Sequence, residues 1–156
     1  MCAGDFEARE KGIAILRHLD QEFPYTGDEA FLHQLFLIFL DNAIKYSPEK
    51  SVLHVSLEEV DGMIRVRFQD HGIGIAAKHL PFIFERFYRA APSSTGDSQS
   101  GGLGLAIAQA IARAHGGAIE CISKVGVGSS FTVVLPLVPV SKIDAPEPSK
   151  QKLIMG

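Results

Sequence analysis

The 156-residue sequence has no tryptophan, only two cysteines and no excess of positive charge. Fifteen lysines and arginines stand against eighteen aspartates and glutamates, which gives a formal net charge of −3. Nucleic-acid binding depends on clustered Lys and Arg that neutralise phosphates, so this balance argues against DNA or RNA as a partner. Cys2 and Cys121 lack the C-x-x-C spacing of metal and redox sites, and we expect both to be reduced thiols.

Long apolar runs are also missing. The most apolar stretch, residues 31–40, is interrupted by His33 and Gln34 and is far shorter than the roughly 20 residues that span a bilayer. The N-terminus has no basic region followed by an apolar core, which argues against a secretory signal. We therefore expect a cytoplasmic domain without direct membrane contact.

The composition is sufficient for one packed domain. Hydrophobic residues make up 46% of the chain and charged residues 21%, which is compatible with a hydrophobic core. At this length one domain is expected rather than two. We place it at residues 12–138, between an N-terminal lead (1–11) and a flexible tail (139–156) in which Pro, Ser and Lys residues show little periodicity.

Two segments have the spacing of helices. Apolar residues recur at helical intervals over 31–43, after Asp28 and before Pro48, which predicts a helix between these two residues. A second apolar periodic stretch, 105–114, follows a run of glycines and ends at another one. Looser alternation at 12–19 predicts a strand ahead of both helices.

Four further runs predict strands. Residues 52–57 and 63–68 alternate around the Asp-Gly dipeptide at 61–62, which is typical of a two-residue hairpin turn. Residues 118–123 and 129–135 flank a glycine-containing turn. This order predicts an α+β fold: a two-layer α/β sandwich whose mixed, mostly antiparallel sheet of about five strands has about three helices on one face.

Four blocks along this order resemble the ATP-binding catalytic domain of sensor histidine kinases, within the superfamily that includes gyrase, the ninety-kilodalton heat-shock chaperones and the MutL repair ATPases. The resemblance covers residues 12–136. The blocks are Leu40-Asp41-Asn42-Ala43-Ile44-Lys45-Tyr46-Ser47-Pro48, Asp70-His71-Gly72-Ile73-Gly74, Pro81-Phe82-Ile83-Phe84-Glu85-Arg86-Phe87-Tyr88-Arg89 and Gly102-Leu103-Gly104-Leu105-Ala106-Ile107.

The resemblance implies a Bergerat-type fold that binds ATP and Mg²⁺. It implies a protein-histidine kinase activity, in which the γ-phosphoryl group passes to a histidine on a separate dimerisation domain and then to a response-regulator aspartate. No histidine of this sequence has the surroundings of that phosphoacceptor, so the dimerisation domain is an expected partner. We expect the catalytic domain by itself to be monomeric.

Asn42 and Lys45 lie three residues apart on the first helix, so their side chains can reach the same site. An amide oxygen suits Mg²⁺ and an ammonium group suits phosphate. By resemblance Asn42 is the metal ligand, both residues are catalytic, and Tyr46 lines the nucleotide. The alternative is that they form only the polar face of an amphipathic helix.

Asp70 ends a strand, where its carboxylate can accept a hydrogen bond from an amine. By resemblance that amine belongs to adenine. Gly72 and Gly74 lack a Cβ and permit a close approach of the backbone to a flat base. The alternative is a turn that only connects two elements.

Gly102 and Gly104 open the second helix, whose free N–H groups and positive dipole end suit triphosphate oxygens. The alternative is that glycine there permits tight helix packing. The family has another glycine where this chain has Ser100, and Gly101 stands beside it. By resemblance the other nucleotide-contacting residues are Ile73, Ile75, Phe84, Gly101, Leu103, Leu105 and Thr132.

Arg86 and Arg89 lie in an irregular segment, about 80–101, which we interpret as a lid. Guanidinium groups can bind the γ-phosphate as bidentate donors, and by resemblance one of these arginines stabilises charge on the transferring phosphoryl group. Alternatively both are solvated surface side chains. The sequence does not decide which of the two points inward.

Ile38 departs from the family, which has a polar residue four places before the metal-binding Asn. Ile38 can neither accept a proton nor polarise water, so the gyrase type of spontaneous ATP hydrolysis is disfavoured. A kinase tolerates this change because its nucleophile is an imidazole of another domain. Three alternatives remain: a nucleotide-binding regulatory module with weak or no catalysis, a clamp ATPase, and a related serine kinase.

Overall fold

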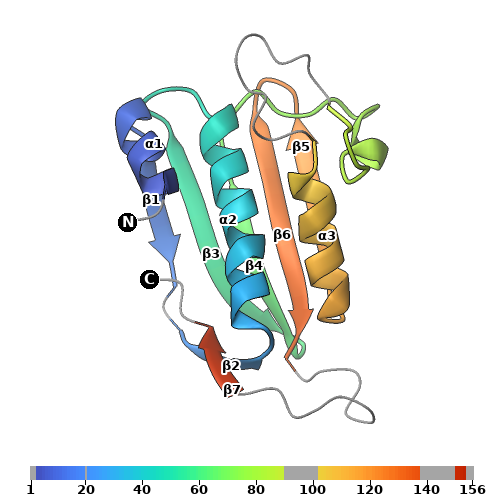
Figure 1. The fold of residues 1–156 in the computed structure, drawn as a ribbon. Helices are drawn as coiled ribbons and strands as arrows, with labels where there is room; N and C mark the ends of the chain where they lie inside the picture. Colours follow the sequence, from blue (N-terminus) through green and yellow to red (C-terminus); the bar gives the residue numbers. More distant parts are fainter. Residues whose placement is uncertain (1–2, 20, 90–101, 138–149, 154–156) are drawn as a thin grey trace.

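Helices and strands are described here for residues 3–19, 21–89, 102–137 and 150–153 of a computed structural model. Figure 1 shows their arrangement. In chain order the elements are α1 (Ala3–Lys11), β1 (Ala14–His18), β2 (Phe23–Thr26), α2 (Glu29–Tyr46), β3 (Val52–Val60), β4 (Met63–Gln69), the 3-10 helix η1 (Leu80–Phe82), α3 (Gly104–Ala114), β5 (Ala118–Lys124), β6 (Gly128–Pro136) and β7 (Lys150–Leu153).

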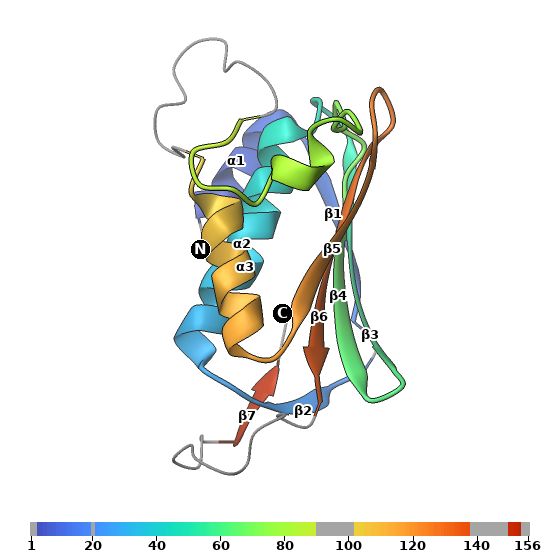
Figure 2. The same ribbon diagram turned by 90° about the vertical axis from the view of Figure 1, so that its right-hand side faces the viewer.

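The main sheet has five strands in the order β1-β3-β4-β6-β5. β1 and β3 are parallel, whereas the other neighbouring pairs are antiparallel. Figure 2 views the sheet nearly edge-on, with α1, α2 and α3 on the same side. This arrangement confirms the predicted α+β sandwich with a mixed, mostly antiparallel sheet and helices on one face.

α2 begins and ends where the sequence predicts. The Oδ1 atom of the N-cap residue, Asp28, accepts a hydrogen bond from the Phe31 N–H (3.1 Å), which satisfies one free donor of the first turn. Ser47 is the C-cap, and Pro48 cannot continue the helix because it lacks an N–H. The face toward the sheet buries Leu32, Leu35, Phe36, Phe39, Ala43 and Ile44.

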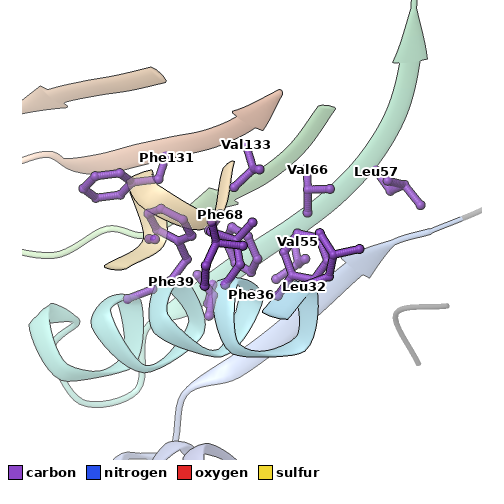
Figure 3. Close-up of a cluster of buried hydrophobic side chains, with 14 of the residues drawn as sticks. Leu32, Phe36, Phe39, Val55, Leu57, Val66, Phe68, Phe131 and Val133 are labelled. Atoms are coloured by element: carbon purple, nitrogen blue, oxygen red, sulfur yellow. The ribbon is translucent and has the colours of Figure 1, made fainter. Parts of the chain in front are cut away.

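The hydrophobic core lies between α2 and the sheet (Figure 3). The Phe39 ring centroid lies 5.7 Å from that of Phe68 on β4 and 5.3 Å from that of Phe131 on β6. Burial of such a side chain contributes roughly 1.5–3 kcal/mol. These rings therefore fix α2, and the polar residues at its C-terminal end, over β4 and β6.

Asp61 and Gly62 form the turn between β3 and β4, as predicted. Their φ angles are +53° and +77°, and Val60 pairs with Met63 across the turn. Two central residues with positive φ are typical of the type I′ turn that joins antiparallel strands. The register of β4 on β6 then brings Asp70, the residue after β4, to the start of β6, where its N–H donates to the Ser129 carbonyl (2.9 Å).

α1 lies within residues 1–11, which we expected to be an N-terminal lead outside the domain. It contains few apolar residues, so periodicity gives no signal for it. One of them, Ala8, is buried at 3% exposure, and the Lys11 side chain hydrogen bonds to α2. Tertiary contacts with the rest of the domain, and not an apolar stripe, hold this helix.

β7 lies within the segment that we expected to be a flexible tail, residues 139–156. It pairs antiparallel with β2, and Thr26 stands opposite Lys150. Pro24 argues against a strand at β2 in the sequence, because proline is tolerated only at edges and ends of strands. A two-stranded sheet is compatible with that limit, since both of its strands are edges.

Candidate functional site

Asp70 is a buried carboxylate at the end of β4, with 6% of its surface exposed. Its Oδ1 atom accepts hydrogen bonds from the N–H groups of Gly72 (2.9 Å) and Ser129 (3.1 Å). Both bonds use the same oxygen, and no described residue donates to Oδ2. The second oxygen can therefore accept a hydrogen bond from a ligand.

Burial raises the pKa of Asp70, because desolvation disfavours the ionised carboxylate. The hydrogen bonds from Gly72 and Ser129 and the nearby His71 lower the pKa but do not cancel the effect of burial. A carboxylate held in this way interacts more strongly with a ligand donor than one in water does. A perturbed acid beside glycine loops is typical of a functional site.

Glycines bring three elements together around Asp70. A Cβ atom on Gly72 would lie 2.2 Å from the carbonyl oxygen of Tyr46 at the end of α2. A Cβ on Gly128 would lie 2.2 Å from the Asp70 carbonyl oxygen. Neither position has space for a side chain, so glycine permits the contact of the α2 end, the loop after β4 and the start of β6.

Ser123 and Ser129 connect the loop after β4 to the β5–β6 hairpin. The Ser123 Oγ atom accepts a hydrogen bond from the Ile75 N–H (2.7 Å) and lies 2.7 Å from the Ser129 Oγ atom. The Ser129 N–H is also one of the two donors to Asp70. The sequence analysis did not identify either serine, although Ser129 directly follows the hairpin glycine, where β6 starts beside the end of β4.

Thr132 does not belong to this site, contrary to our expectation. It lies on β6 opposite Arg67 of β4 and Glu120 of β5. Its neighbours Phe131 and Val133 are part of the core beneath the helices, and side chains alternate between the two faces of a strand. Thr132 therefore faces the side of the sheet away from the helices, and Ser129 is the β6 residue that contacts Asp70.

Asn42, Lys45 and Tyr46 lie in the last turns of α2, next to the Asp70 loop. Asn42 and Lys45 are half-buried, and the Tyr46 side chain is 42% exposed. The Lys45 Nζ atom lies 5.4 Å from the centroid of the Tyr46 ring, within cation–π range. The amide oxygen of Asn42 suits a hard cation, and Mg²⁺ commonly uses one or two protein ligands together with phosphate oxygens and water.

The N-terminal end of α3 has the geometry of an anion site. Gly102 has a φ angle of +75°, which L side chains rarely adopt. The N-cap residue, Leu103, gives no side-chain hydrogen bond, and the first intrahelical bond runs from the Ile107 N–H to the Leu103 carbonyl. The N–H groups of Gly104 and Leu105 thus have no partner within the helix, and the positive end of the helix dipole lies there.

The start of α3 lies against α2, one helical turn before Asn42. A Cβ on Gly104 would lie 3.5 Å from the Cγ2 atom of Ile38. The side chain of Ile38 is half-buried and packs against the core. The polar end of α2 and the free N–H groups of α3 therefore belong to one site, and Ile38 adds no polar atom to it.

The segment after the Asp70 loop is tied to the start of α3. Phe84, which we expect to line the nucleotide, is half-buried and packs against the core. Phe87 has a φ angle of +65°, and its N–H donates to the Gly102 carbonyl (3.0 Å). The Tyr88 hydroxyl hydrogen bonds to the Nδ1 atom of His79. These contacts hold residues 80–89 at the edge of the site.

Several predicted residues lie at the surface or pack against the core. Arg86 and Arg89 are exposed. Ile73 is 57% exposed, whereas Ile75 packs against the core. Gly101, and most of the segment that we interpreted as a lid, lie outside the described residues.

The chemistry of the site is that of binding a polar ligand. The Cys121 thiol has a pKa raised to about 12, mainly by burial and secondarily by Asp70, so it stays protonated and is a poor nucleophile. No group of three or more His, Cys, Asp or Glu side chains in the described ranges could hold a metal ion. The site offers instead a fixed carboxylate, an amide, an ammonium group and free backbone N–H groups.

The sequence matches the family described as histidine kinase-, DNA gyrase B-, and HSP90-like ATPase over residues 27–139. It is 35% identical over 129 residues to the sensor histidine kinase CusS of Escherichia coli O6:H1, covering 83% of this chain and 26% of that protein. It is 38% identical over 134 residues to the heme sensor protein HssS of Staphylococcus saprophyticus, covering 86% and 28%. The chain thus spans about a quarter of the length of these curated relatives.

Solved structures also superpose on this chain. The mycobacterial sensor histidine kinase MprB superposes with a TM-score of 0.74 at 30% identity, covering 87% of this chain and 91% of that one. Full-length ShkA in complex with AMPPNP superposes with a TM-score of 0.73 at 29% identity, covering 88% and 29%. Within the described residues, no helix has the length and apolar character needed to cross a membrane.

Proposed function

Because this chain belongs to the family of histidine kinase-, DNA gyrase B-, and HSP90-like ATPases, we propose that it is the ATP-binding kinase domain of a two-component sensor histidine kinase. It transfers the γ-phosphoryl group of ATP to a histidine of a separate dimerisation domain. The observation that carries this proposal is the Asp70 carboxylate, fixed through one oxygen by Gly72 and Ser129, beside the ends of α2 and α3.

Asp70 selects the base. Its Oδ2 atom accepts a hydrogen bond from the exocyclic amine of adenine, while Oδ1 stays bound to the two backbone donors. Gly72 and Gly74 keep the loop after β4 close to the end of α2 and to the β5–β6 hairpin, because a Cβ would lie 2.2 Å from the Tyr46 carbonyl oxygen or 2.1 Å from that of Lys124. A guanine, which has a carbonyl at that position, would place an acceptor against the carboxylate and is rejected, because a buried acceptor pair leaves both groups without a donor.

The ends of α2 and α3 hold the phosphates. The N–H groups of Gly104 and Leu105 donate to phosphate oxygens at the positive end of α3, and the Lys45 ammonium adds a charge. Asn42 is the residue that would hold Mg²⁺, whose bound charge offsets that of the triphosphate. Arg86 or Arg89, in the segment at the edge of the site, reaches the γ-phosphate as a bidentate donor.

The nucleophile comes from the partner domain. The lone pair of an imidazole nitrogen forms the N–P bond while the bond from the γ-phosphorus to the bridging oxygen breaks, and ADP leaves with that electron pair. The imidazole proton passes to solvent or to a base of the partner. This chain supplies position and charge stabilisation. Because Ile38 cannot activate water, steady ATP hydrolysis by the chain alone is not expected.

The partners follow from this reaction: the dimerisation domain that carries the acceptor histidine, and a response regulator that receives the phosphoryl group on an aspartate. A second candidate, favoured by Ile38 at the α2–α3 contact and by Ser100 in the glycine run, is a regulatory module that binds nucleotide without efficient transfer.

The test is phosphotransfer in trans. The chain is incubated with γ-labelled ATP, Mg²⁺ and a purified dimerisation domain that carries the acceptor histidine. We expect acid-labile, alkali-stable label on that domain, and no label when its histidine is replaced by glutamine. ATP binding without labelling would support the regulatory module, and label on a serine would support the serine kinase alternative.

A further inference from the structure

Lys11 is bonded to the C-terminal end of the helix that carries the proposed metal ligand. Its Nζ atom donates hydrogen bonds to the backbone carbonyls of Ile44 (2.9 Å) and Lys45 (3.0 Å) on α2. The Lys11 side chain is 28% exposed, so much of this contact is shielded from water. Figures 1 and 2 both place α1 beside the end of α2 at which these carbonyls lie.

The last carbonyls of a helix have no partner within it, and those of α2 are satisfied from outside the helix. The Ala43 carbonyl accepts from both the N–H (3.1 Å) and the hydroxyl (2.6 Å) of Ser47. The Ile44 carbonyl has only a long bond from the Ser47 N–H (3.4 Å) in addition to Lys11. Lys11 therefore supplies the better bond to Ile44 and a bond to Lys45, and it places a cation at the negative end of the helix dipole.

The backbone of Lys11 is fixed as well. Its carbonyl accepts a hydrogen bond from the Lys50 N–H (2.8 Å), just after α2. The Glu7 carboxylate lies 4.0 Å from the Lys11 Nζ atom but is 50% exposed, and an ion pair of this kind contributes little. The two carbonyls of α2 are thus the stronger partners of the ammonium group.

The turn that Lys11 holds is the one that forms the site. Lys45 is one of the two residues whose carbonyls it binds, and Asn42 lies less than one helical turn earlier. The Tyr46 carbonyl of the same turn lies 2.2 Å from the position of a Cβ on Gly72, in the Asp70 loop. A shift of this turn therefore moves the amide of Asn42 relative to the Asp70 carboxylate.

We propose that Lys11 is a positioning residue for the metal end of the nucleotide site. By binding the Ile44 and Lys45 carbonyls, Lys11 fixes the position and orientation of the last turn of α2. Through that turn it fixes the position of the Asn42 side chain. This inference rests on the proposed function of the site. Some residues orient metal ligands without touching the metal. Their removal typically lowers the metal affinity by about 10–100-fold.

The test separates the metal end of the site from the adenine end. Lys11→Met retains the apolar stem and removes the charge and the donors, and Lys11→Arg retains both. Arg9→Met is the matched control, because Arg9 is an exposed basic residue on the same turn of α1. For each chain, Mg²⁺ is titrated calorimetrically at saturating AMPPNP, and ADP is titrated in excess EDTA.

We expect Lys11→Met to raise the Mg²⁺ concentration for half-saturation by about tenfold and to leave ADP affinity in EDTA unchanged. Lys11→Arg and Arg9→Met should match the wild type. An unchanged Mg²⁺ response of Lys11→Met, or an equal loss of Mg²⁺ and ADP binding, overturns the proposal. If Lys11→Met does not fold, the same two titrations of Lys11→Gln decide. A wild-type chain that binds no AMPPNP refutes the proposed function first, and this inference with it.

Discussion

The environment of Asp70 favours ligand binding but disfavours the ionised form of its carboxyl group. Its burial and its two backbone hydrogen bonds fix the carboxylate for recognition of an amine, but desolvation raises its pKa. A carboxylate whose pKa is higher in the folded than in the unfolded state stabilises the fold below its unfolded pKa. That stability is lost as the pH rises through the folded pKa. At neutral pH the ionised Asp70 therefore costs stability, which is typical of a carboxylate that serves in binding.

Replacement Asp70→Asn should separate stability from binding. The oxygen of Asn can still accept from Gly72 and Ser129, which places an NH₂ group where the ligand needs an acceptor. At pH 7 we expect the variant to be at least as stable as the wild type in urea denaturation. Its advantage should shrink as the pH falls through the raised pKa of Asp70, because the carboxyl group then becomes protonated in the folded wild type.

The control for that experiment is Asp61→Asn, which changes an exposed aspartate in the hairpin turn. Asn is well tolerated at positive φ in this type of turn, so the variant should be about as stable as the wild type at pH 7. A loss of stability of Asp70→Asn at neutral pH would mean that the charge-assisted hydrogen bonds outweigh desolvation, contrary to the raised pKa.

At the scale of single residues, the sequence identifies groups with a distinctive chemistry better than it identifies their neighbours. Asp70 and Gly72 could be predicted from their place at the end of a strand. Ser129 and Thr132 could not be told apart, because both are small hydroxyl residues on β6. Only the register of β6 on β4, and the alternation of its side chains, assigns Ser129 to Asp70 and Thr132 to the opposite face.

The contact between α2 and the Asp70 loop depends on the absence of a side chain at Gly72. Gly72→Ala would place a Cβ 2.2 Å from the Tyr46 carbonyl oxygen, and the backbone must shift to relieve this clash. We expect a loss of roughly 1–3 kcal/mol of unfolding free energy, measured by urea denaturation, together with weaker nucleotide binding.

Gly104→Ala is the matched control, since its Cβ would lie 3.5 Å from Ile38 Cγ2, an ordinary contact, and its φ angle is not positive. Helix propensity favours Ala over Gly, so stability should stay within about 1 kcal/mol of the wild type. Equal destabilisation by both substitutions would contradict the specific role of the Gly72 contact.

His115 joins the far ends of the two long helices. Its Nδ1–H donates to the Ile111 carbonyl of α3 (2.8 Å), and its Nε2 atom accepts from the Asp28 N–H, at the N-cap of α2 (3.2 Å). His115→Ala removes both bonds and should lower the unfolding free energy by roughly 1–2 kcal/mol. His33→Ala, on the exposed face of α2, should change it by less than about 0.5 kcal/mol. Similar effects of the two variants would refute this role of His115.

Elements with a strong apolar period or a defined turn could be predicted from the sequence. α2 has both caps and a full apolar face, and the β3–β4 hairpin has its Asp-Gly turn. α1 is held by Lys11 and by one buried alanine, and β2 and β7 depend on each other over more than a hundred residues. These elements are stabilised by tertiary contacts, which local propensity does not encode.

On the scale of the whole molecule, the candidate site assembles four segments that are distant in the sequence: the end of α2, the loop after β4, the β5–β6 hairpin and the start of α3. The sheet order brings β4 beside β6. The core between α2 and the sheet sets the distance of the polar end of α2 from the sheet. The sequence indicated three of these candidate segments, the end of α2, the loop after β4 and the start of α3, through their resemblance to blocks of the family, but it did not indicate the β5–β6 hairpin. Their mutual placement depends on strand register and on packing.

The proposed function depends on recognition of adenine by Asp70, in a nucleotide site shared with Asn42. Calorimetric titration of the chain with AMPPNP, with and without Mg²⁺, tests it most directly when Asp70→Asn and Asn42→Ala are measured beside the wild type. We expect the wild type to bind, Asp70→Asn to abolish binding while the domain stays folded, and Asn42→Ala to remove only the contribution of Mg²⁺. Undiminished binding by folded Asp70→Asn would contradict it.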